Sequence, residues 1–202
     1  SCDRIHTIVK TVRDAVPAGT PVTAKIRLGF EDRSACLDNA KAIEEAGATW
    51  LTVHCRSKTD GYKPPAYWDW IPRIREVSRI PIIANGDIWN VEDFLRCREV
   101  TGCDQFMIGR GAMSNPYLFR QIRQHESASE ISLHDWQNTK ALLPGFFAAS
   151  TAHINEHFAV SRTKQWLRAL SLKSPEAKHV FDQIKILRKP IEFRSQLENH
   201  CS

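Results

Sequence analysis

The chain of 202 residues is long enough for one sizeable core, or for a core with a small second domain, and its 42% of hydrophobic residues is ordinary for a globular protein. No window approaches the roughly 18 apolar residues of a membrane span, and residues 1–10 have no signal-peptide pattern, so we expect a cytoplasmic protein without a membrane partner. The net charge of +5 mildly favours a polyanionic partner. The six cysteines include no CxxC pair, which argues against a zinc ribbon and favours reduced structural thiols, so we expect no metal.

Strand-like and helix-like segments alternate in the first half of the chain. Helical periodicity predicts a first helix over residues 2–16, and apolar runs predict strands at residues 22–28, 50–53, 81–84 and 105–108. Between and after them we expect helices at residues 34–47 and 68–78, one that begins after Asn90, and one at 117–124. This order is typical of parallel βα units, and four such units make half of a (β/α)8 barrel.

Basic and histidine side chains mark the ends of the first two predicted strands. Lys25 and Arg27 share one face of the first strand, because side chains two residues apart point the same way. At the open end of a barrel strand one of them would face a ligand; the alternative is an edge strand whose cations pair in solvent. His54 follows the second strand and precedes Arg56, which suggests a ligand contact, although a histidine with satisfied hydrogen bonds in the core would have the same position.

Two glycine-bearing loops follow the last two predicted strands, Asn85-Gly86-Asp87 and Gly109-Arg110-Gly111. In (β/α)8 barrels, consecutive loops after late strands commonly bind phosphate through backbone N–H groups. Arg110 would add a charge-assisted hydrogen bond to the same anion. Glycines of this kind also occur in ordinary turns, which is the alternative reading of both loops.

The composition changes near residue 126, and the rest of the chain has helical patterning without glycine-punctuated strands. We predict helices at residues 136–147, interrupted at Pro144, and at 160–172 and 176–187. The expected organisation is an α/β half-barrel at 1–125 followed by a small all-α domain at 126–202. Arg162 and Lys164, beside Trp166, would suit contacts with a nucleic-acid backbone, or would belong to a solvated helix face.

Five motifs taken together closely resemble the tRNA-dihydrouridine synthases, and most of all their bacterial C-type branch. The motifs are KIRLGF, VHCRSKTDGY, IIANGDI, GCDQFMIGRGA and SRTKQWL. The resemblance runs along nearly the whole chain. It corresponds to the last four strands of the family's TIM barrel and to its C-terminal helical domain.

The resemblance implies an FMN enzyme that uses NADPH to reduce a uridine of the tRNA D-loop to 5,6-dihydrouridine. Hydride passes from reduced FMN N5 to uracil C6, and a cysteine protonates C5. By motif, the residues matched to cofactor binding are Lys25, His54, Asn85, Gly86, Asp87, Gly109 and Arg110. Those matched to substrate or tRNA binding are Arg27, Arg56, Arg162 and Lys164.

The chain departs from the family pattern at the proton donor. The segment that carries the catalytic cysteine has no counterpart here, nor do the N-terminal strands that complete the FMN pocket. We therefore assign no catalytic residue and expect these 202 residues to be inactive by themselves. Cys55 stands where the family's VHGR motif has glycine, so we expect it near the flavin but not as a substitute acid.

Two alternative functions remain. A non-catalytic RNA-binding remnant would keep the helical domain and bind no flavin. Another FMN TIM-barrel oxidoreductase, of the dihydroorotate dehydrogenase type, would share the phosphate loops, but a small-molecule enzyme has no need of the helical extension with SRTKQWL.

Overall fold

The computed structural model describes residues 1–126 and 136–201, and it forms two compact units, Ser1–Gly109 and Arg110–Ser202. The helices between residues 110 and 126 fall in the second unit, whereas the sequence analysis placed them in a first domain of residues 1–125. Residues 127–135, where the composition changes, lie outside the described residues. The division into functional domains at 1–125 and 126–202 stays a prediction.

The first unit contains a four-stranded parallel sheet in the order β1-β2-β3-β4. The strands are β1 (Thr23–Arg27), β2 (Trp50–His54), β3 (Ile82–Asn85) and β4 (Gln105–Met107). The helices of this unit are α1 (Cys2–Ala15), α2 (Ala35–Glu45), α3 (Trp70–Val77) and α4 (Val91–Thr101). Strands and helices alternate as predicted, which confirms the series of parallel βα units.

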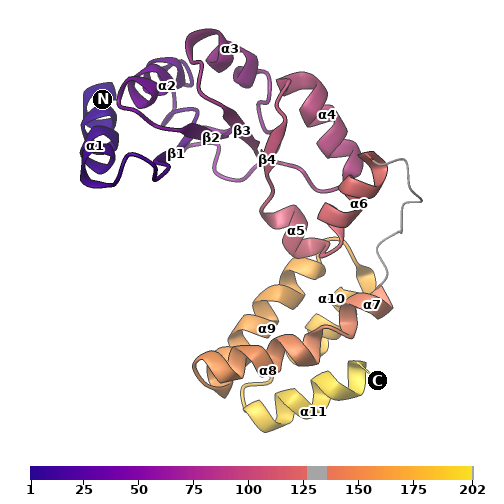
Figure 1. Ribbon diagram of the computed structural model, residues 1–202. Helices are drawn as coiled ribbons and strands as arrows, with labels where there is room; N and C mark the ends of the chain where they lie inside the picture. The colour runs from indigo at the N-terminus through magenta and orange to yellow at the C-terminus, as the bar shows by residue number, and fades with distance from the viewer. Residues whose placement is uncertain (127–135, 202) are drawn as a thin grey trace. The chain divides into compact units, whose positions relative to one another are not determined.

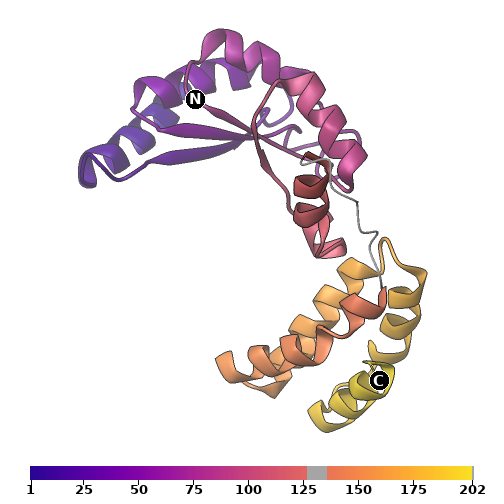
Figure 2. The same cartoon turned by 45° about the vertical axis from the view of Figure 1, so that its right-hand side comes forward.

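The two faces of this sheet differ in what covers them. Figures 1 and 2 show α1 to α4 on one side of the strands. Leu51, Val53 and Ala84 point to that side and are fully buried. Because side chains alternate along a strand, the register defines an opposite set, here called the polar face. The polar face carries Lys25, Arg27, Thr52, His54, Ile83, Asn85, Gln105 and Met107.

Helix α4 separates β3 from β4, and specific residues fix both of its ends. The side chain of Asn90 accepts a hydrogen bond from the backbone N–H of Asp93 at 2.7 Å, which confirms the predicted N-cap. At the other end Gly102 has a φ of 60°, and its N–H donates to the carbonyl of Arg98. This left-handed cap turns the chain into β4.

The second unit is helical throughout its described residues. Its helices are α5 (Arg110–Ser114), α6 (Leu118–Glu126), α7 (Trp136–Lys140), α8 (Leu143–His153), α9 (Glu156–Leu170), α10 (Pro175–Ile184) and α11 (Pro190–Cys201). One apolar cluster holds the last four of them together. Its buried members are Leu143, Phe147, Ala159, Val160, Leu167, Leu170, Ala177, Val180, Ile184, Phe193 and Leu197.

Several helix boundaries differ from the prediction for capping reasons. Helix α9 begins four residues before the predicted Val160, because Asn155 caps it and accepts from the N–H of Phe158 at 2.9 Å. Pro144 lies in the first turn of α8, where no intrahelical N–H is needed, so it begins a helix and does not interrupt one. Helices α5 and α11 were not predicted from the sequence.

Candidate functional site

The predicted cofactor residues of the first unit meet at the carboxyl edge of the sheet. In the parallel register Arg27 lies beside His54, His54 beside Asn85, and Asn85 beside Met107. All four are the last residues of their strands, and all four belong to the polar face. Carboxyl edges of parallel sheets are where ligands usually bind in α/β folds.

A chain of hydrogen bonds links β1, β3 and β4 across this edge. The amino group of Lys25 donates to Asn85 Oδ1 at 2.9 Å, and Asn85 Nδ2 donates to the carbonyl of Met107 at 2.7 Å. Partial burial, and then the positive charge of Arg27, lower the pKa of Lys25. The structure therefore brings together Lys25 and Asn85, which lie 60 residues apart in sequence.

Arg27 organises the loop of residues 57–63 that follows β2. One guanidinium nitrogen donates to the carbonyls of Ser57 at 2.8 Å and Gly61 at 2.9 Å. The guanidinium also lies 5.3 Å from the ring centre of Tyr62. Because two carbonyls and an aromatic ring carry no opposite charge, these contacts leave the positive charge of Arg27 at the edge of the sheet.

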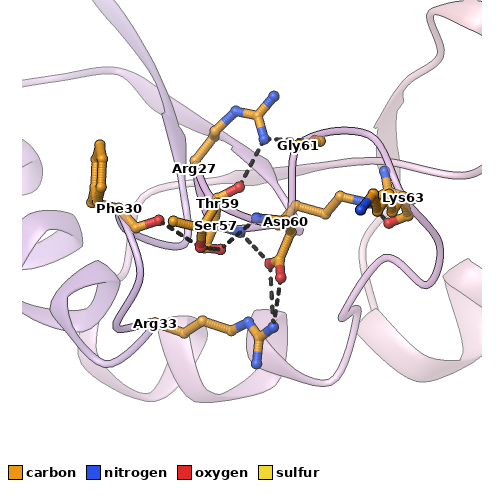
Figure 3. Close-up of polar contacts among 9 residues, drawn as sticks. Arg27, Phe30, Arg33, Ser57, Thr59, Asp60, Gly61 and Lys63 are labelled. Carbon is orange, nitrogen blue, oxygen red and sulfur yellow. Dashed lines mark hydrogen bonds and ion pairs between the residues drawn. The ribbon is translucent and has the colours of Figure 1, made fainter.

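The 57–63 loop is closed by Asp60, which the sequence analysis missed. Its carboxylate accepts from the N–H of Ser57 at 2.7 Å and from Arg33 at 3.0 Å. These bonds, the Ser57 ones first, lower the pKa of Asp60 to about 2. Figure 3 shows Arg27 on one side of the loop and the Asp60–Arg33 pair on the other. The TDG sequence at 59–61 was the available signal, since an aspartate before glycine is typical of such turns.

The same loop is tied to the one that follows β1. The N–H of Lys58 donates to the carbonyl of Gly29, and the N–H of Thr59 donates to the carbonyl of Phe30, both at 2.9 Å. Figure 3 shows the second of these contacts. These two hydrogen bonds hold the loops after β1 and β2 together at the carboxyl edge of the sheet.

His54 ends β2 and is 8% exposed. Its ring centre lies 6.1 Å from that of Tyr62, at an angle of 39°. A Cβ atom placed on Gly86 would come within 3.4 Å of the His54 ring. His54 therefore lies between the loops after β2 and β3, where the predicted cofactor contact and the core alternative are both compatible with its burial.

Arg56 is fully buried, and the substrate-side role expected for it stays a prediction. It forms an ion pair with Asp87, and its Nε donates to the carbonyl of Lys63 at 2.7 Å. Its remaining Nη1 has no hydrogen-bond partner among the described residues. The side chain therefore links the 57–63 loop to the loop after β3, and it does not present its charge to solvent.

The loop after β3 needs a glycine at position 86. Its φ of 130° is one that side-chain-bearing residues rarely adopt, and a Cβ there would lie 3.1 Å from the Cβ of Ala66. The indole of Trp68 donates to the Gly86 carbonyl at 2.9 Å, and Asp87 follows with a φ of 52°. Gly109 closes the first unit with open space at its Cβ position, and Arg110 begins α5. A phosphate contact by these residues stays a prediction.

The thiols of the first unit are packing groups. Cys55 is fully buried, its Sγ lies 3.7 Å from the carbonyl of Val53, and burial raises its pKa. The neighbouring Cys97 has its pKa raised to about 12, by burial first and then by Cys103. Cys55 belongs to the helix-covered side, so the predicted place near a flavin does not give it a reactive thiol. All six cysteines are free.

The two predicted RNA contacts of α9 have different surroundings. Arg162 is exposed and donates to Gln165 Oε1 at 2.8 Å. Lys164 is half-buried and donates to the carbonyl of Leu187, while Trp166 donates to the carbonyl of Met113 at 3.1 Å. Arg162 is thus available to a partner, whereas Lys164 is engaged within the unit.

Within the described ranges, no helix has the length and hydropathy that crossing a bilayer requires. The same residues contain no group of three or more His, Cys, Asp or Glu side chains arranged to hold a metal ion.

Comparison of this sequence with known proteins identifies the family to which the chain belongs. The family model described as dihydrouridine synthase (Dus) matches residues 1–201. The tRNA-dihydrouridine(16) synthase of Shewanella oneidensis is 46% identical over 194 residues, which are 96% of this chain and 60% of that protein. The proteins of the same name from Pseudomonas syringae pv. tomato and Neisseria meningitidis serogroup B are 45% and 40% identical, over 90% and 96% of this chain and 57% and 58% of their own lengths. The chain thus spans about 60% of the length of these curated relatives, and it belongs to the dihydrouridine synthase family.

Proposed function

We propose that the protein takes part in the reduction of a tRNA uridine to 5,6-dihydrouridine, with FMN as cofactor and NADPH as reductant. The first unit would supply the C-terminal half of a (β/α)8 barrel and residues 126–202 a helical tRNA-binding domain, acting in the cytoplasm. The observation that carries the proposal is the hydrogen-bonded set of Lys25, Asn85 and Met107 beside Arg27 at the carboxyl edge. Membership of the family, and relatives named tRNA-dihydrouridine(16) synthase, support it.

The charge at this edge fits an anionic cofactor. Lys25 donates to an amide oxygen and Arg27 to two carbonyls, so these hydrogen-bond partners of both cations are uncharged. Partial burial first, and then the repulsion between the two cations, lowers the pKa of Lys25, and an anion bound here would relieve that repulsion. Lys25 and His54 would contact the flavin ring, and the loops of Asn85, Gly86, Asp87, Gly109 and Arg110 would hold the phosphate.

When bound, FMN would supply the hydride that reduces the uracil ring. The residues of this chain would place charge and hold the loops around the cofactor. Lys25 keeps a positive charge beside the site, and Asn85 fixes the direction of that amino group. Arg27 holds the 57–63 loop with Tyr62 at the edge, and Arg56 fixes the carboxylate of Asp87. We assign the proton-donor role to none of the six cysteines.

The excess positive charge lies in the second unit and supports an RNA partner. Residues 110–202 contain 13 Lys or Arg against 8 Asp or Glu, whereas residues 1–109 contain 15 of each. The whole net charge of +5 therefore belongs to the helical unit. Such a charge is attractive to a phosphate backbone, and Arg162 is the exposed motif residue that would meet it.

Two measurements on the same sample test the proposal. After incubation with FMN and desalting, we expect the protein to keep the visible absorption bands of a flavin, and we expect it to shift unmodified tRNA in a gel. Dihydrouridine formed with NADPH would then be measured by mass spectrometry of digested tRNA. A folded sample that shifts tRNA and never retains FMN would favour the RNA-binding remnant. Retained FMN without any tRNA shift would favour another flavin oxidoreductase.

A further inference from the structure

One flank of α9 in the second unit carries two cations, Lys164 and Arg168, and Lys164 contacts the turn of residues 185–189 between α10 and α11. Lys164 and Arg168 are four residues apart on α9, so their side chains are neighbours on the helix surface. The amino group of Lys164 donates to the carbonyl of Leu187. This bond fixes the turn against the helix and places the next residue, Arg188, beside the same flank.

The carboxylates of this region are already paired with other cations. Asp182 pairs with Lys185 at 2.7 Å, and Glu192 pairs with Lys189 at 3.0 Å. Across the described ranges, neither Arg168 nor Arg188 has a carboxylate within ion-pair distance, and both are exposed. The flank thus presents cations without counter-charge.

The charge of Arg188 acts on Lys164, its neighbour on this flank. Partial burial and then the charge of Arg188 lower the pKa of Lys164. Cations held together in this way repel one another, and a bound anion would remove that cost. A polyanion would gain more than a small ion, because each neutralised phosphate also releases condensed counterions.

We propose that Arg188, together with Arg168, is a phosphate contact for RNA, and that Lys164 is the positioning residue that holds the 185–189 turn in place. This rests on the proposed function, since tRNA is the polyanion concerned. Arg188 lies outside the SRTKQWL motif, so the RNA-facing surface extends from α9 to the next turn. Lys164 then acts through its bond to Leu187 more than through direct contact.

The test compares Arg188→Gln with two matched variants in the 202-residue chain. Lys10→Gln makes the same change in net charge on α1 of the first unit, where Lys10 is paired with Asp14. The double variant Lys189→Gln/Glu192→Gln removes an ion pair from the turn without changing net charge. Affinity for an unmodified tRNA transcript is measured by fluorescence anisotropy over a range of salt concentrations.

We expect Arg188→Gln to weaken tRNA binding several-fold and to reduce the slope of log affinity against log salt by about 0.7 to 0.9. Both control variants should keep the wild-type slope, and Arg188→Lys should restore most of the affinity. The melting temperature of Arg188→Gln should be unchanged or slightly higher, because a like-charge neighbour of Lys164 is gone. In a Lys164→Gln background, Arg188→Gln should have a smaller effect than in the wild type.

If Arg188→Gln binds tRNA like Lys10→Gln while the wild type binds well, the inference is overturned and the proposed function stands. If the wild-type chain binds no tRNA under any salt condition, both are overturned. A loss of affinity accompanied by a clear loss of melting temperature would also overturn it, since that pattern indicates a structural role.

Discussion

Lys25 is well placed to meet an anion at the carboxyl edge, because its amino group donates there to the uncharged amide oxygen of Asn85. We expect Lys25→Met to weaken FMN binding about tenfold, since a charge-assisted hydrogen bond contributes at least ~1.4 kcal/mol. Stability should change little, because the side chain is exposed. Titration of flavin fluorescence gives the affinity, and Lys25→Arg serves as the variant that keeps the charge. Equal affinity in Lys25→Met and wild type would remove Lys25 from the proposed site.

Gly86 is a position where the backbone itself requires glycine. Alanine there would carry a Cβ 3.1 Å from the Cβ of Ala66 at a φ of 130°. We expect Gly86→Ala to lower the free energy of unfolding by about 1–3 kcal/mol, as measured by urea denaturation. Gly19→Ala is the control, because a Cβ at Gly19 would meet nothing within 4 Å. Equal midpoints for the two variants would contradict this reading of the loop.

The cysteines should fall into two classes of reactivity. Cys2 is partly exposed, whereas burial raises the pKa of Cys201, that of Cys36 to about 11 and that of Cys97 to about 12. Only thiolates react quickly, so we expect one fast thiol, Cys2, in the native protein at pH 8 and six in denaturant. A colorimetric thiol assay gives the count. Fast reaction of Cys55 in the native state would show that it is not a packing group.

At the scale of elements, the bonds by which Asp60 joins the loops after β1 and β2 should weaken in acid. The pKa of Asp60 is about 2 when folded, against an ordinary value of 3.8. A lowered pKa means that Asp60 contributes stability above about pH 4, and that this contribution is lost as the pH falls towards 2. Asp60→Asn should therefore be less stable than wild type at pH 7, and the difference should shrink between pH 4 and 2.

Thermal unfolding followed by circular dichroism at several pH values measures this difference. Glu31→Gln, an exposed carboxylate variant in the loop after β1, is the control and should show no such convergence. A stability gap for Asp60→Asn that stays constant down to pH 2 would mean that its carboxylate charge does not close the loop.

The strands, the N-cap of α4 and the carboxyl-edge residues could be predicted from sequence because each has a local signal. Apolar runs, a capping Asn90 and polar residues directly after strands are all read within a few positions. The Arg56–Asp87 pair spans 31 residues, and nothing local shows that it buries the guanidinium. Strand alternation was enough to place Cys55 on the helix-covered side with Val53, whereas the motif match that suggested a place near the flavin did not use it. The short α5 and the α11 that begins at Pro190 lack a strong apolar period and were not predicted.

At the scale of the whole molecule, the boundary between the two units separates both the net charge and the apolar cores. Residues 1–109 carry balanced charge, and residues 110–202 carry the full net charge of +5. The second unit also has its own apolar core. Separate production of residues 1–109 and 110–202 should therefore give RNA binding that falls with salt only for the second fragment. Equal binding by both fragments would show that the charge division does not locate the RNA surface.

The boundary of the helical domain can be decided by comparing fragments 110–202 and 126–202. Within the second unit, Trp166 donates to the carbonyl of Met113 in α5, so α5 contributes a partner to a side chain that packs on the core. The shorter fragment loses that bond and exposes the indole, and it should be less stable by at least about 1 kcal/mol. Chemical denaturation followed by tryptophan fluorescence measures this directly. Trp166→Phe in the longer fragment is the matched variant, because it keeps an aromatic ring without the N–H.

If both fragments and this variant unfold at the same denaturant concentration, α5 is not part of the helical domain and the predicted boundary at residue 126 holds. If the shorter fragment alone loses stability, the helical domain begins at Arg110.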